Sequence, residues 1–150
     1  MDENLFKQRT KQLALRFIEM VDALPKNRTA DVIGRQLIRS GTSIGDNYRA
    51  ACRGKSTADV IGKLRIVEEE ADESAYWMEL LVESGLVSEA RLSELIQETN
   101  EITAMTVASI RTLQKRNGNP PINRQSKTCA ELSRSIENLN LVGIVALVVT

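Results

Sequence analysis

The residues with the most chemical potential lie between positions 39 and 56, in the stretch RSGTSIGDNYRAACRGKS. Its end, Gly54-Lys55-Ser56, matches the last part of the phosphate-loop pattern G-x-x-x-x-G-K-[ST], which cradles nucleotide phosphates. That pattern also needs a glycine at position 49, where this chain has Arg49, and a preceding buried strand, which the sequence does not predict. A helix boundary explains the same residues: Gly54 ends one helix in the left-handed conformation, and Ser56 caps the next, with Asp59 as its capping-box partner.

Basic side chains are the best candidates for a binding surface. Residues 28–55 carry a net charge of +4 and residues 63–83 a net charge of −5. Two hypotheses stay open: the basic residues pair with those acids, within or between subunits, or they contact the phosphates of structured RNA. Pairing is favoured because the two charges nearly cancel. The candidate nucleic-acid or subunit-interface residues are Arg35, Arg39, Arg49, Arg53 and Lys55.

Catalytic and metal chemistry find little support in the sequence. The chain has no histidine, which removes the commonest general base and metal ligand. The acids of residues 68–73 could form an all-carboxylate Mg²⁺ or Ca²⁺ site, but a solvated or intersubunit acidic face is the simpler interpretation. Cys52 is expected to act as a small hydrophobic residue, since no base for a thiolate is visible. We therefore predict a non-enzyme without metal or cofactor.

Tyr76 and Trp77 are adjacent, so they point about 100° apart on a helix. They cannot both face one core. We expect one to pack inside the bundle and the other to lie at an edge or subunit interface, where amphipathic aromatic side chains are common. Stacking on a cofactor is the alternative.

Four helical segments must position these residues. Apolar side chains recur at spacings of three and four over 4–24, 29–53, 56–84 and 88–117, and stop signals such as Pro25, Gly85 and Gly118 follow. In the fourth segment the predicted stripe ends with Thr106, Ser109 and Leu113. These segments predict an all-α, up-down-up-down four-helix bundle over residues 1–118. Arg111, Lys115 and Arg116 would favour the negative end of the last helix dipole.

The second helix contains unusually many small residues. A glycine inside a helix costs about 1 kcal/mol relative to alanine, and this segment holds Gly34, Gly41 and Gly45. Packing must offset that cost, so we predict that another helix approaches closely at these positions.

Composition limits the remaining possibilities. The chain has 150 residues, 42% of them hydrophobic, and a net charge of zero, which argues against a dedicated nucleic-acid binder. Two cysteines and the absence of a signal peptide fit the cytoplasm. No apolar run reaches the ~20 residues of a membrane span. Residues 120–126 are predicted to form a linker, and residues 128–138 could make a short helix. The apolar run at 139–149 could be a strand, a segment packed on the bundle or an interaction tail. Residues 119–150 as a whole are expected to be either disordered or packed on the bundle.

Several motifs resemble one protein family. The stretch at 39–56, followed by DVIGKL, EEADES, YWMELL and ESGLV, is similar to the bacterial S23, or 23S ribosomal RNA intervening-sequence, proteins over residues 5–117. The resemblance implies a four-helix bundle that assembles into a ring, typically a pentamer, acting as a scaffold. The alternative it implies is a nucleic-acid-binding accessory protein that works with ribosomal RNA or a reverse transcriptase, as in diversity-generating retroelements. The signature residues, expected to serve in packing, are Ser40, Ser43, Ile44, Asn47, Ser56, Tyr76 and Trp77, together with Arg39 and Thr42.

Overall fold

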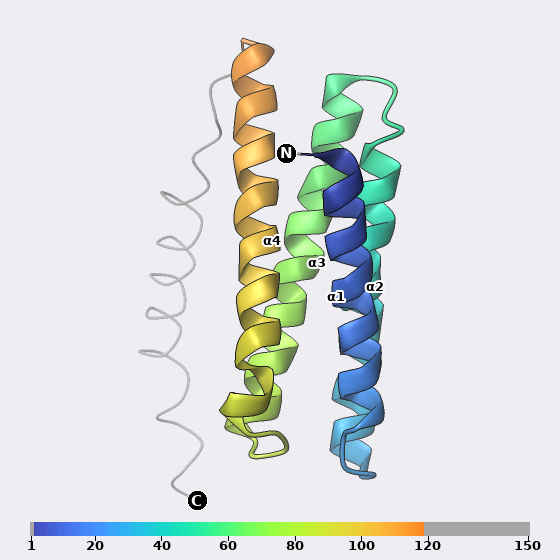
Figure 1. Ribbon diagram of the computed structural model, residues 1–150, viewed down its shortest axis with the longest axis vertical. Helices are drawn as coiled ribbons and strands as arrows, with labels where there is room; N and C mark the ends of the chain where they lie inside the picture. Colours follow the sequence, from blue (N-terminus) through green and yellow to red (C-terminus); the bar gives the residue numbers. More distant parts are fainter. Residues whose placement is uncertain (1, 119–150) are drawn as a thin grey trace, which may run out of the picture. The chain divides into compact units, whose positions relative to one another are not determined.

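Four helices alternate in direction along the chain and lie side by side (Figure 1). The computed structural model describes residues 2–118, and the predicted linker and apolar tail, with Cys129, lie outside them. The all-α, up-down-up-down four-helix bundle is confirmed. Its helices are α1 (Glu3–Asp22), α2 (Arg28–Ala51), α3 (Thr57–Glu83) and α4 (Glu89–Arg116). None of these four helices has the length and hydropathy to cross a membrane.

Local signals fix the helix ends. The side chains of Asp2, Asn27 and Ser56 accept hydrogen bonds from backbone N–H groups in the first turns of α1, α2 and α3, which satisfies donors that a helix leaves unpaired. The chain leaves α3 through Gly85, whose φ of 72° suits glycine far better than other residues.

The prediction that Gly54 takes a left-handed backbone is wrong. Among the described glycines, positive φ occurs at Gly85 and Gly118. Glycine suits position 54 for lack of space, because a Cβ there would lie 2.5 Å from Cγ2 of Val60 and 3.1 Å from the carbonyl oxygen of Ala51. The capping box is also only half formed: Asp59 accepts the N–H of Lys55 at 3.0 Å rather than that of Ser56.

Helices α1 and α2 approach as closely as the glycines predict. A Cβ on Gly41 would stand 2.2 Å from Cδ2 of Phe17, and one on Gly34 would stand 2.8 Å from Cγ1 of Val21. Phe17 is fully buried, so its ring occupies the space that a larger residue at position 41 would need. The core around this contact is aliphatic, with Leu37, Ile44, Val67, Met78, Leu81, Leu92 and Ile102 fully buried.

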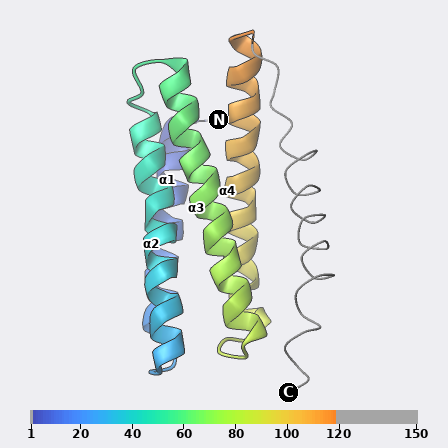
Figure 2. The ribbon, with the colours of Figure 1, turned by 180° about the vertical axis from the view of Figure 1, so that it is seen from behind.

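Helix α3 lies between α2 and α4 (Figure 2) and shares the most extensive interfaces with them. Helix α1 packs on α2 and makes few contacts with α4. The predicted stripe of α4 is displaced in its last turns, where Ile110 and Gln114 are buried while Ser109 and Leu113 are half-buried. Leu113 still packs against the core. Helix periodicity of 3.6 residues allows either set, because the two sets lie on adjoining faces of the helix.

Candidate functional site

Arg39 sits on α2 where it faces the acids of α3. Its guanidinium donates to the carboxylate of Glu73 and lies 3.6 Å from Oε2 of Glu70. Trp77 Nε1 donates to the same Glu73 carboxylate at 2.9 Å. The Arg39 hydrogen bond, followed by that of Trp77, lowers the pKa of Glu73, and the same pairing raises the pKa of Arg39. The charge of Arg39 is therefore partly neutralised by acids of its own chain, at the surface of the bundle.

Buried hydroxyl groups lie beside this cluster. Oγ of Ser74 on α3 donates to Oγ of Ser40 on α2 at 2.9 Å, and both side chains are fully buried. Ser40 Oγ also lies 3.1 Å from the carbonyl oxygen of Gln36. A small polar residue at each position lets α2 and α3 come close while every buried hydroxyl keeps a partner.

Four other signature residues also have structural roles. Asn47 Nδ2 donates to both the carbonyl oxygen and Oγ of Ser43, at 3.0 and 2.9 Å. Ile44 is fully buried in the core, and Ser56 caps α3. Packing and capping within one chain therefore explain the residue type at these four positions.

The aromatic pair on α3 divides between core and surface. Trp77 packs against the hydrophobic core and is half-buried, while Tyr76 is 53% exposed. Their ring centroids are 5.3 Å apart in an edge-on arrangement. Tyr76 is thus the aromatic side chain available to a partner.

The remaining basic candidates separate into two groups. Arg35 forms an ion pair with Asp31, one turn earlier on α2, at 2.7 Å. Arg49, Arg53 and Lys55 are exposed, and their side chains form no ion pair within residues 2–118. The five candidates therefore do not form one surface: two are engaged on the side of the bundle, and three remain at its end.

Sequence reasoning missed Arg9, which bridges α1 and α4. Its guanidinium donates to Glu98 at 2.8 and 2.9 Å and to Glu101 at 2.7 Å, and Nη1 lies 3.2 Å from Sδ of Met105. The bonds to Glu98 and Glu101 raise the pKa of Arg9, and Arg9 in turn lowers the pKa of Glu101. The spacing of Glu98 and Glu101, three residues apart, was the available signal, because it places both carboxylates on one face of α4.

A groove opens between the last turns of α4 and the α2–α3 connection. Its volume is about 580 Å³, and Cys52 and Tyr48 lie in its wall. Burial raises the pKa of the Cys52 thiol, so the thiolate needed for nucleophilic chemistry is scarce at neutral pH. Burial also raises the pKa of Tyr48, whose ring packs 4.4 Å from that of Phe6, centroid to centroid.

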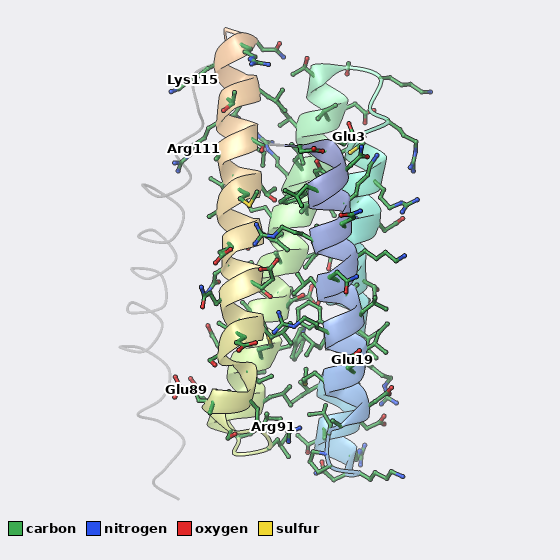
Figure 3. All side chains as sticks on the ribbon, viewed as in Figure 1. Glu3, Glu19, Glu89, Arg91, Arg111 and Lys115 are labelled. Atoms are coloured by element: carbon green, nitrogen blue, oxygen red, sulfur yellow. The ribbon has the colours of Figure 1, made fainter. Side chains whose placement is uncertain are left out.

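The last turns of α4 bring further basic residues to the same end of the bundle. Arg111 and Lys115 point away from α4 near its carboxyl end, while Glu89 and Arg91 lie at the opposite end (Figure 3). Arg111, Lys115 and Arg116 are exposed. The expectation from sequence assigned them only to the helix dipole and did not connect them with the basic residues of α2.

Comparison with known proteins adds a family. Residues 2–108 match the family described as 23S rRNA-intervening sequence protein. A solved structure of a protein with unknown function, from the S23 ribosomal protein family of Bacteroides thetaiotaomicron VPI-5482, is 32% identical, with a TM-score of 0.69. The match covers 74% of this chain and 99% of that one. No curated protein matches the chain.

Proposed function

Because the chain belongs to the 23S rRNA-intervening sequence protein family, we propose that it acts as a non-enzymatic, homo-oligomeric scaffold. The observation that carries this proposal is the outer side of α1. Leu15 and Ile18, three residues apart, are 42% and 38% exposed, and α1 makes few contacts with α4. Neighbouring apolar side chains on a surface favour association with another protein. The pentameric number follows from the family resemblance.

The cytoplasm is the compartment proposed for this role. Cys52 forms no disulfide within residues 2–118, and reducing compartments keep thiols free.

Association is tested by light scattering and sedimentation of the purified full chain. The double variant Leu15→Glu/Ile18→Glu is expected to shift the oligomer towards monomer, because it places two charges in an apolar contact. The matched control, Gln8→Glu/Gln12→Glu, adds the same charge at exposed positions of the same helix and should leave the mass unchanged. A monomeric wild-type chain at micromolar concentration would refute the proposal.

A second candidate function is that of a nucleic-acid-binding accessory protein acting with ribosomal RNA. The side chains of Arg49, Arg53 and Lys55, which are exposed and form no ion pair within residues 2–118, favour it, as does the ribosomal RNA in the family description. The resemblance adds a reverse transcriptase as an alternative partner. Salt-dependent binding of RNA by the nuclease-treated protein tests this function, since phosphate contacts weaken steeply as salt rises.

A further inference from the structure

Six basic side chains gather at one end of the bundle. They come from the last turn of α2, the α2–α3 connection and the last turns of α4 (Figure 1). All six are exposed, and within the described part of the chain none forms an ion pair. No acid occurs in the two stretches that supply them, 49–55 and 111–116. This basic end consists of Arg49, Arg53, Lys55, Arg111, Lys115 and Arg116.

The charge asymmetry extends along the whole bundle. The half that includes the basic end, residues 2–12, 40–69 and 103–118, has 11 basic and 6 acidic side chains. The other half, residues 13–39 and 70–102, has 6 basic and 12 acidic side chains. A nearly neutral chain therefore carries +5 on one half and −6 on the other, and only the first attracts a polyanion.

The groove described above lies at the same end of the bundle, between the two helix ends that supply these cations. Its wall includes Val60 and Leu64 from α3, and Leu113 and Arg116 from α4. The acid in the wall, Glu3, is held by an ion pair with Lys7. A largely apolar recess of about 580 Å³ with Arg116 in its wall suits a planar, uncharged base attached to phosphates.

We infer that the basic end binds single-stranded RNA, with backbone phosphates on its six cations and an unpaired base in the groove. The inference deepens the second candidate function and rests on it. Four of the six residues are arginines, whose planar guanidinium matches phosphate geometry.

The acidic half of a second copy of the chain is a weaker candidate than RNA for binding to the basic end. Its acids Glu73, Glu98 and Glu101 are already bound by Arg39 and Arg9, so they have less charge to offer another chain.

The experiment measures the affinity of the full chain for a labelled single-stranded RNA and for an RNA duplex of equal length, at several salt concentrations. Two variants alter the basic end on different helices: Arg49→Gln/Arg53→Gln and Arg111→Gln/Lys115→Gln. The control Lys26→Gln/Arg28→Gln removes the same charge from exposed positions at the other end of the bundle. Light scattering confirms the assembly of each protein.

Each basic-end variant should bind single-stranded RNA about tenfold or more weakly, and the control should bind within about twofold of wild type. The wild-type salt slope should be about −4 if all six cations meet phosphates, and shallower by about 1.4 in each variant. If one variant changes the oligomeric state, the RNA affinity of the other variant, on the other helix, tests the inference.

Three results would overturn the inference. No RNA binding by wild type removes the second candidate function as well. If both basic-end variants bind RNA as tightly as wild type, the second candidate function is still supported, but the basic end is not the RNA-binding surface. Equal affinity for the duplex removes the role of the groove. As an independent check, alkylation of Cys52 in a Cys129→Ser background, at a pH above 8 because burial raises the Cys52 pKa, should slow when single-stranded RNA is bound.

Discussion

Helix α1 meets its two neighbours in opposite ways. Against α2 it packs without a gap, and the ring of Phe17 occupies the space that a side chain on Gly41 would need. Against α4 it makes few contacts, and long charged side chains cross between the helices: Arg9 reaches Glu98 and Glu101, and Arg16 reaches Glu94 at 3.4 Å.

The difference concerns what each interface tolerates. The contact between Gly41 and Phe17 exists only because glycine has no Cβ. It cannot adapt to an added atom, because the interior is already closely packed. An arginine that spans a wider separation can change rotamers and keep part of its interaction, while water screens what remains. The α1–α2 interface should therefore respond to side-chain volume, and the α1–α4 interface to pH and salt.

The largest effect is expected from Gly41→Ala. Its Cβ would stand 2.2 Å from Cδ2 of Phe17, so the ring or the backbone must move, at a cost of about 1–3 kcal/mol. The gain of about 1 kcal/mol in helix propensity only partly offsets this cost. Urea unfolding should show a net loss of stability.

The same substitution in a Phe17→Leu background gives the control. Leucine has no Cε atoms, and its branched, flexible end can turn away from the new Cβ in a way that a flat ring cannot. Gly41→Ala should therefore cost less there, and the double-mutant cycle should show a coupling. Additive effects of the two substitutions would contradict the steric explanation.

A smaller effect is expected from Arg9→Met at the other interface. Methionine keeps the apolar stem near Met105 but loses the bonds to Glu98 and Glu101, which should cost about 1 kcal/mol at pH 7 for a side chain that is 28% exposed. Arg9 lowers the pKa of Glu101 from its ordinary 4.5. A lowered pKa gives stability that is present above the unfolded-state pKa and is lost as pH falls through the folded value. The gap between variant and wild type should therefore narrow below about pH 4.5.

Arg16→Met serves as the comparison for this prediction. Its single ion pair with Glu94 is long, and the Glu94 side chain is 88% exposed, so little change in stability is expected. A difference between Arg9→Met and wild type that stays constant from pH 7 to pH 3 would show that packing, rather than charge, explains the role of Arg9.

Sequence alone predicted what depends on neighbours along the chain. The four helices, the cap at Ser56 and the close approach at Gly34 and Gly41 follow from periodicity and local hydrogen bonding. Gly54 was misjudged because a glycine required for space has the same sequence signature as one required for positive φ.

The candidate site was less predictable, because it depends on which helix faces which. Opposite charges on α2 and α3 suggested pairing, but only the fold shows that Arg39 is paired with α3 while Arg49 and Arg53 form no ion pair with the described residues. The partners of Arg9 are about 90 residues away, and no local pattern joins them. The basic end was missed for the same reason, since Arg49 and Arg111 come to the same end of the bundle only after α4 has returned along it.

The smallest effect, and one of opposite sign, is expected from Gly45→Ala. The nearest atom to a new Cβ is the carbonyl oxygen of Thr10 at 3.5 Å, an ordinary contact distance. The gain in helix propensity is then not offset by a steric clash, and the free energy of unfolding should rise by about 0.5–1 kcal/mol in the same urea assay. Two glycines one turn apart on α2 would thus differ in sign, which requires the tight contact with α1 to be confined to the neighbourhood of Phe17. Destabilisation by Gly45→Ala would instead mean that the whole length of α2 requires small residues against α1.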